Sequence, residues 1–319
     1  MKSFRLLVVA LLVVVVAATS FAAGAGEEEF PSEAVTVIVP YRAGGGMDTT
    51  ARTMASVSEE YLGVPLVVVN RTGGAGTIAT VEASRAEPDG YTLLMVDIGV
   101  LAVTPLTQDV QYALSDFDAV SGVNVNDIIL VVPADSPYQT ADDLAEADER
   151  VRYGTTGRGS ILHAIATAFI DQTGIEATNV PFGSTADTVN AVLGGNIDVG
   201  VAHPNQARTG LADGTLRAIG VFSNERVEAL PDVPTMVEQG YPIAQQLYNV
   251  VLGPAGVPED RLEVLREAFV GMLNDPVVTG NAANRNLVLW PESGETVGPQ
   301  LLTDAAAIAQ TFRELGVVE

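Results

Sequence analysis

The sequence predicts an α/β fold in which two lobes enclose a cleft. Two features of the chain lead to this prediction. Short β-branched or aliphatic runs alternate with helical patterns across glycine-rich turns, and this alternation begins again near the middle of the 319 residues. Such an order is typical of α/β domains with a mostly parallel sheet, and the length leaves room for two of them.

The first lobe opens with a strand, a glycine-rich break and a helix. Gly63 stops this helix, and Pro88-Asp89-Gly90 forms a turn before a later strand. We expect strands at 34–40, 66–70 and 91–96, and helices at 48–62 and 77–86.

The second lobe repeats this order. Ser184 and Asp187 resemble a capping box at the start of a helix over 185–193, and Gly194 suits its end. The other elements expected here are β runs at 128–132, 151–154, 180–182, 197–202 and 216–222, and helices at 141–147 and 161–172. A strand at 248–252 and helices at 258–273 and 298–315 complete the chain. We therefore assign 30–131 plus 248–319 to lobe 1 and 132–247 to lobe 2.

Composition excludes several classes of function. Acidic residues number 40 against 16 basic ones, a net charge of −24, so a nucleic-acid partner is not expected. There is no cysteine, which excludes disulfides, thiolate metal sites and cysteine nucleophiles. His163 and His203 are the only histidines, so we expect no histidine-rich metal site. A hydrophobic fraction of 47% indicates a globular chain.

The first residues have the pattern of an export signal. Lys2 and Arg5 precede an apolar run at 6–18 and a zone of small residues. We assign residues 1–23 as a signal peptide, with cleavage between Ser20 and Gly26. The apolar run is short for a membrane span, although an uncleaved anchor is the alternative. No cysteine follows that could carry a lipid, so the mature protein is expected to be soluble and outside the cytoplasm.

Two glycine-rich loops are candidate anion sites. The first, at 40–48, lies between a strand and a helix, where free backbone N–H groups meet the positive end of the helix dipole. The alternative is a tight turn with Asp48 as the N-cap. The second loop, at 155–160, also precedes a helix, for which Ser160 is the expected N-cap. One such loop in each lobe would place the two opposite each other across a cleft.

Two enzymatic interpretations of the sequence have less support than an anion-binding site. Gly74, Gly76 and Ala79 fit a dinucleotide-binding pattern, and Asp97 ends the next strand. An exported protein meets little NAD, so we expect no cofactor. Ser160 lies three residues before His163, but no G-x-S-x-G motif surrounds it and the N-cap role explains it.

The chain resembles the substrate-binding proteins of tripartite tricarboxylate transporters, the Bug family. The resemblance extends along nearly the whole chain after the signal and rests on motifs in family order. These are VTVIVPYRAGGGMDTTAR at 35–52, VVVNRTGGAGT at 67–77, PDGYTLL at 88–94, YGTTGRGSILH at 153–163, VPFGS at 180–184, LGGNIDV at 193–199, LPDVPT at 230–235 and LGPAGVP at 252–258.

This resemblance implies a periplasmic receptor of the type II, Venus-flytrap fold, not an enzyme. Its two lobes would close on a small carboxylate, with di- or tricarboxylates favoured, and hand it to a membrane permease. Presentation of the ligand to a membrane sensor kinase is the alternative, and an extracytoplasmic enzyme is a third. A monomer is the default expectation.

The resemblance also implies the ligand-binding residues. From the first loop these are Tyr41, Arg42, Ala43, Gly44, Gly45 and Asp48, the last in a structural role. From the second lobe they are Thr155, Thr156, Gly157, Arg158, Gly159, Ser160, His163, Phe182, Gly183, Ser184, His203 and Asn205. Arg42 and Arg158 either contact ligand carboxylates or point to solvent at the rim. Phe182 replaces a tyrosine usual in the family, and Thr72 a proline.

Overall fold

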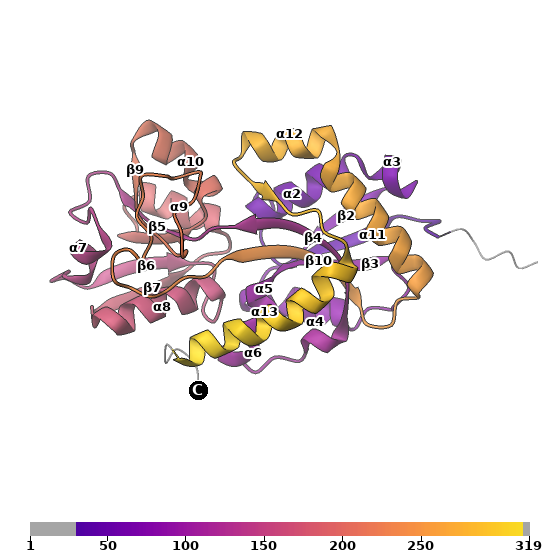
Figure 1. Cartoon of the computed structure of the whole chain (residues 1–319), viewed down its shortest axis with the longest axis horizontal. Coiled ribbons are helices and arrows are strands. Elements are labelled where there is room, and N and C mark those ends of the chain that lie inside the picture. The colour runs from indigo at the N-terminus through magenta and orange to yellow at the C-terminus, as the bar shows by residue number, and fades with distance from the viewer. Residues whose placement is uncertain (1–29, 315–319) are drawn as a thin grey trace, which may run out of the picture.

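Two lobes lie side by side along the long axis of the molecule, and two long strands run between them (Figure 1). The structure, a computed structural model, describes residues 30–314. The predicted signal peptide at 1–23 lies outside the described residues. The connecting strands are β4 (Phe117–Asn126) and β10 (Leu247–Pro254), which pair with each other. The two-lobed α/β prediction is confirmed.

Lobe 1 is built on a six-stranded sheet with the order β11-β4-β10-β3-β1-β2, counted over residues 30–314. Its remaining strands are β1 (Val35–Val39), β2 (Leu66–Asn70), β3 (Thr92–Asp97) and β11 (Val288–Leu289). β1 runs parallel to β2 and β3, whereas β10 runs antiparallel to β3 and β4. The expectation of a mostly parallel sheet is wrong, because β10 re-enters lobe 1 from lobe 2 in the opposite direction.

Lobe 2 contains a five-stranded sheet with the order β7-β6-β8-β5-β9. Its strands are β5 (Ile129–Pro133), β6 (Val151–Thr155), β7 (Ala177–Pro181), β8 (Val199–Ala202) and β9 (Leu216–Val221). Residues 129–131, which the sequence division placed in lobe 1, pair with β8 and β9. The chain therefore changes sheets between Asn126 and Ile129, and it returns to the first sheet at Leu247.

Helices cover both sheets. Those of lobe 1 are α2 (Gly46–Ala55), α3 (Ser58–Leu62), α4 (Thr77–Ser84), α5 (Ile98–Ala102), α6 (Thr104–Thr107), α11 (Glu259–Asn274), α12 (Pro276–Asn284) and α13 (Gly294–Glu314). Those of lobe 2 are α7 (Ala141–Ala145), α8 (Ile161–Thr173), α9 (Thr185–Leu193) and α10 (Pro204–Asp213). Short 3₁₀ turns lie at Gly74–Gly76 and Leu114–Asp116. Among residues 30–314, no helix is both long and apolar enough to cross a bilayer.

The helix expected at 48–62 is interrupted at Val57. The Ser56 hydroxyl donates to the Thr53 carbonyl at 2.7 Å, and the Ser58 hydroxyl donates to the Ala55 carbonyl at 3.0 Å. Serine hydroxyls compete with backbone donors in this way and favour helix ends. The chain therefore bends between α2 and α3, and α3 ends at Gly63 in a left-handed conformation, as predicted.

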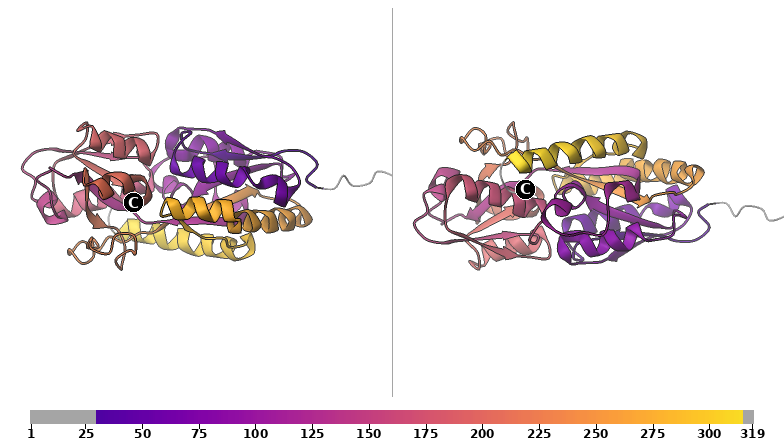
Figure 2. Two further views of the ribbon diagram at one scale, coloured as in Figure 1. Left: turned by 90° about the horizontal axis from the view of Figure 1, so that it is seen from above. Right: turned by 90° about the horizontal axis from the view of Figure 1, so that it is seen from below.

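The apolar core is continuous between the lobes on one side. Ile98 and Val100 of α5 belong to the same buried cluster as Ile161 and Ile165 of α8. α13 packs against β4 and α5, and its C-terminal end reaches the boundary between the lobes (Figure 2). This packing holds the lobes together beside the crossing strands.

Candidate functional site

A cavity lies between the two lobes. It encloses about 720 Å³ of empty space, counted out to its open mouth, and residues of both lobes line it. The predicted site residues that line it are Tyr41, Gly45, Thr156, Ser160, Ser184, His203 and Asn205. Those that lie elsewhere are Arg42, Ala43, Gly44, Asp48, Thr155, Gly157, Arg158, Gly159, His163, Phe182 and Gly183.

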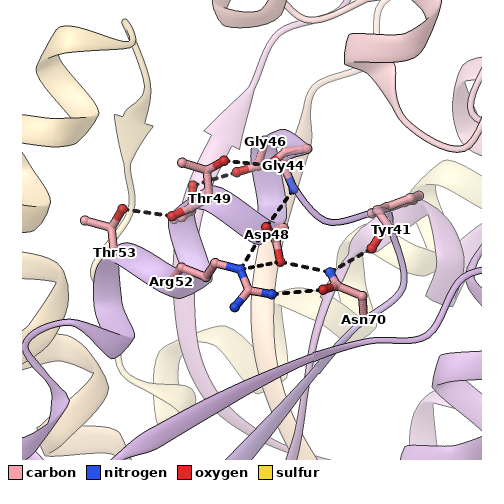
Figure 3. Close-up of polar contacts among 10 residues, drawn as sticks. Tyr41, Gly44, Gly46, Asp48, Thr49, Arg52, Thr53 and Asn70 are labelled. Atoms are coloured by element: carbon pink, nitrogen blue, oxygen red, sulfur yellow. Dashed lines mark hydrogen bonds and ion pairs between the residues drawn. The ribbon is translucent and has the colours of Figure 1, made fainter.

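Asp48 holds the first glycine-rich loop in place (Figure 3). Its buried carboxylate accepts from the Gly44 N–H at 2.8 Å, from Arg52 Nε at 3.0 Å and from Asn70 Nδ2 at 2.9 Å. Burial alone would raise the pKa of Asp48, but these hydrogen bonds outweigh it and hold the pKa below its usual value. Asp48 is not the N-cap, since Gly45 occupies that position and Asp48 bonds back from the first turn of α2.

The part of this loop that reaches the cavity is the start of α2. Gly45, Gly46 and Met47 line the cavity. The N–H groups in the first turn of a helix have no intrahelical acceptor, so those of Gly46 and Met47 are available to a ligand. The sequence-based prediction named Gly44 and Gly45 but not Gly46 and Met47, because it placed the helix start at Asp48 rather than at Gly46.

The second loop is split between two surfaces. Ser160 caps α8, with its Oγ accepting from the His163 N–H at 3.2 Å and donating to the Gly157 carbonyl at 2.8 Å. The predicted N-cap is confirmed, and Thr156 and Ser160 line the cavity. Thr155 faces the interior of lobe 2, where its Oγ1 accepts from Asn179 Nδ2 at 2.9 Å.

The remainder of the second loop faces lobe 1 at a separate, open hollow. Gln108 Nε2 donates to the Arg158 carbonyl at 2.9 Å, and Thr107 Oγ1 donates to the Gly159 carbonyl at 3.1 Å. His163 also borders this hollow, and its Nδ1 accepts from the Gly159 N–H at 3.3 Å. Burial, followed by the charge of Arg158, lowers the pKa of His163. These residues join the lobes behind the cavity.

Two further loops of lobe 2 border the cavity. Ser184 caps α9 by accepting from the Asp187 N–H at 3.2 Å, while Phe182 packs into the apolar core of this lobe. His203 is the N-cap residue of α10, and its Nδ1 lies 2.8 Å from the Asp127 carbonyl oxygen. Burial lowers the pKa of His203. Asn205 Oδ1 is buried and has no hydrogen-bond partner among the described residues.

Three buried polar residues form a row across the sheet of lobe 1 at the cavity. Asn249 of β10 lies directly opposite Asp97 of β3 on one side and opposite Asn124 of β4 on the other. Asn249 Nδ2 donates to Asn124 Oδ1 at 3.0 Å, and Asn124 Nδ2 has no partner within residues 30–314. Sequence reasoning missed both asparagines, because β4 was not predicted and the pairing of β10 cannot be read from local patterns.

Asp97 is bonded to Tyr41 within the cavity wall. The Tyr41 hydroxyl donates to Asp97 Oδ2 at 2.5 Å, and the Val100 N–H donates to Oδ1 at 3.2 Å, which makes Asp97 the N-cap of α5. Burial raises the pKa of both side chains. The sequence did single out Asp97, but as the acid of a dinucleotide site; here it is part of the cavity between the lobes.

Arg285 is a third residue near the cavity that the sequence did not reveal. Its half-buried guanidinium donates to the Gly46 carbonyl at 3.2 Å and lies 3.4 Å from Thr50 Oγ1 and from Asn281 Oδ1. It forms no ion pair within residues 30–314. Burial lowers the pKa of Arg285. A cation therefore lies directly behind the start of α2.

No group of three or more histidine, aspartate or glutamate side chains that could hold a metal ion is present in the described part of the chain.

Comparison with known proteins identifies the relatives of this chain. The model of the family described as tripartite tricarboxylate transporter family receptor matches residues 50–306. BugT of Bordetella pertussis is 31% identical over 243 residues, which cover 74% of this chain and 74% of BugT. The solved periplasmic binding protein BugD is 26% identical with a TM-score of 0.83, covering 91% of this chain and 99% of BugD.

A further solved structure shares the fold. MatC from Rhodopseudomonas palustris, with bound malate, is 24% identical with a TM-score of 0.82, covering 89% of this chain and 100% of MatC. The family model spans most of the chain, and the two-lobed architecture agrees with it. The dinucleotide and hydrolase alternatives find no support in these relatives. The chain belongs to the tripartite tricarboxylate transporter receptor family and is a solute receptor rather than an enzyme.

Proposed function

We propose that this receptor binds a small organic carboxylate in the cavity between its lobes. The observation that carries the proposal is a convergence of helix starts. The N-cap residues of α2, α8, α9 and α10, which are Gly45, Ser160, Ser184 and His203, all line the one cavity. Each helix start carries a partial positive charge, so four of them favour a bound anion. The first turns of α2, α8 and α9 also offer backbone N–H donors, whereas α10 begins with Pro204, which has none.

Arg285 adds a full positive charge behind one of these helix starts. Because its guanidinium touches the Gly46 carbonyl and has no acidic partner within residues 30–314, its field is not cancelled locally. A carboxylate at the first turn of α2 would then meet both N–H donors and this charge. The malate bound in MatC, a protein of the same fold, is a ligand of the same chemistry.

We further propose that the protein is exported and delivers its ligand to a membrane permease of the tripartite tricarboxylate type. The N-terminal pattern at 1–23 supports export, and the family description supports the transporter as partner. A pull-down of tagged, ligand-loaded receptor with detergent-solubilised membranes of the source cell tests this step. Recovery of a sensor kinase in place of a permease would favour the alternative role.

Thermal unfolding with a ligand panel tests the binding proposal. Ligand-free mature protein is heated with mono-, di- and tricarboxylates and with neutral sugars. A carboxylate present at about a thousand times its Kd stabilises the fold by roughly 4 kcal/mol, a shift of several degrees in Tm. A shift with sugars and none with any carboxylate contradicts the proposal.

A matched pair of variants locates the site. Arg285→Gln removes the charge behind α2 and is expected to weaken carboxylate binding by about three- to tenfold. Arg313→Gln removes an exposed arginine of α13, away from the cavity, and leaves the affinity unchanged. Equal effects of the two variants would show that only the overall charge of the protein matters.

A further inference from the structure

We propose that Asp97 binds a positively charged amine on the ligand, so that this receptor selects carboxylates that also carry an ammonium group. The proposal rests on the carboxylate-binding function above and adds a second charge to the ligand. It concerns the part of the cavity wall to which Asp97, Tyr41 and His203 belong.

The charges of the cavity wall are the first argument. Asp97 is the only carboxylate among the described residues that line the cavity, and no lysine or arginine lines it. Asp97 is only 7% exposed. The basic group that acts on Asp97 is His203, which burial favours in its neutral form. An ionised Asp97 is therefore not balanced by a cation of the cavity wall, and its burial without one raises its pKa.

The hydrogen bonds of Asp97 leave room for one more partner. Oδ2 accepts from the Tyr41 hydroxyl and Oδ1 from the Val100 N–H. The Gly99 N–H also acts on this carboxylate. An ionised carboxylate offers about four acceptor positions, so these neutral donors do not saturate it. When a ligand displaces water, a second negative charge beside Asp97 is repelled, whereas an ammonium group is attracted and supplies N–H donors.

The polar row across the sheet gives the ligand a direction. Asp97, Asn249 and Asn124 stand side by side on three adjacent strands, so they share one face of the sheet. The bond from Asn249 Nδ2 to Asn124 Oδ1 leaves the Asn124 Nδ2 donor free within the described residues. The row thus offers an acceptor for an ammonium group at one end and a donor for a carboxylate oxygen at the other.

Succinate, malate and aspartate test the proposal, because they share one four-carbon dicarboxylate skeleton and differ by hydrogen, hydroxyl or ammonium at one carbon. Glutarate and glutamate form a second pair of greater length. Calorimetry with ligand-free protein is expected to show that the amino member of at least one pair binds about tenfold or more tightly than its plain counterpart. Equal or tighter binding of the plain members overturns the proposal.

Asp97→Asn supplies the decisive variant. Asparagine has nearly the same shape and is a good N-cap, so α5 retains its start. We expect the amino ligand to lose about tenfold or more in affinity while its plain counterpart binds equally well or better. An equal loss for both ligands would mean that Asp97 acts only as the N-cap of α5 and as the partner of Tyr41, which overturns the proposal.

Tyr41→Phe is the second variant, informative even where Asp97→Asn does not fold. It keeps the carboxylate and removes one of its neutral donors, so the preference for the amino ligand is expected to increase by about twofold or more. A preference that stays the same or falls contradicts the proposal. Absence of binding by every carboxylate, amino or plain, counts against the carboxylate function itself and is recognised by the ligand panel above.

Discussion

Arg42 Nη1 lies 3.6 Å from Asp187 Oδ2, and this ion pair joins the two lobes. Arg42 follows β1 in lobe 1, whereas Asp187 is in the first turn of α9 in lobe 2. The Arg42 side chain lies so close over Gly183 that a Cβ there would overlap its Nε atom. Arg42 therefore contacts the opposite lobe, and it is not among the residues that line the cavity.

Breaking this pair is expected to weaken ligand binding by favouring separated lobes. The side chains are 65% and 37% exposed, so the effect is small, about two- to fivefold in Kd for Arg42→Gln or Asp187→Asn. The double variant should lose no more than either single variant. Calorimetry at low and high salt checks this, since screening reduces the difference from wild type. Additive losses would argue for separate roles.

Gly99 allows α5 to approach α8 closely. An added Cβ would lie 2.6 Å from both Cβ and Cγ2 of Ile161, the first residue of α8 in the other lobe. Gly99→Ala should therefore force the lobes apart and weaken ligand binding by about ten- to a hundredfold, in line with an overpacking cost of about 1–3 kcal/mol. Calorimetry measures the affinity, and small-angle scattering measures the larger radius of the ligand-bound protein.

Gly280→Ala is the matched control for this variant. Gly280 lies inside α12, and an added Cβ there meets no atom within 4 Å. This change should leave ligand affinity unaltered and raise stability slightly, because alanine favours a helix over glycine. If Gly99→Ala behaved like the control, the closeness of α5 and α8 would have no role in binding.

Local patterns predicted the elements that carry local signals. The helix at 185–193 was placed correctly because Ser184 caps it and the apolar spacing is regular. By contrast, β4 was missed, since FDAVSGVNVN combines glycine and asparagine with only two buried valines, Val120 and Val123, which do not alternate along the strand. Its strand character comes from pairing with β10, a partner more than a hundred residues away. The mixed sheet direction has the same cause.

Residues of the cavity were predicted where a sequence motif ends in a helix cap. They were missed where the pairing of strands in the sheet brings them to the cavity. Ser160 and Ser184 have side chains that a capping pattern reveals, and both line the cavity. Asn124, Asn249 and Arg285 have no motif of their own. Strand register brings the two asparagines to the cavity, and chain packing brings Arg285 against Gly46 behind the start of α2. That residues of the two glycine-rich loops bind the ligand remains a prediction.

The Asp48 network predicts a loss of stability in acid. Its pKa is below the ordinary 3.8, so the hydrogen bonds from Gly44, Arg52 and Asn70 stabilise the fold fully above that value. This contribution decreases as the pH falls through the lower, folded-state pKa. Asp48→Asn should cost about 1.5–3 kcal/mol at pH 7, with the difference from wild type shrinking below about pH 4.

Denaturant unfolding at a series of pH values measures this difference. Asp135→Asn, a change at an exposed aspartate, serves as control and should match wild type in stability at neutral pH. A gap between Asp48→Asn and wild type that stayed constant down to pH 3 would contradict the role given to the ionised carboxylate.

The excess of acidic residues predicts how salt affects ligand capture. A net charge of −24 repels an anionic ligand at long range, whereas the helix starts and Arg285 act over a few ångströms. Because salt screens charges beyond about 10 Å at 0.1 M, added salt should weaken the repulsion first. The association rate constant is therefore expected to rise, by about two- to tenfold between 0.01 M and 0.15 M salt.

Stopped-flow fluorescence can follow this rate through Trp290, the single tryptophan of the chain. Its ring lies 4.9 Å from that of Tyr248 on β10, beside the strands that join the lobes. For two ligands that bind, the one with the larger negative charge should show the steeper rise, since repulsion scales with the product of the charges. A rate that falls with salt would mean that the positive field of the cavity extends far enough to attract the ligand from solution.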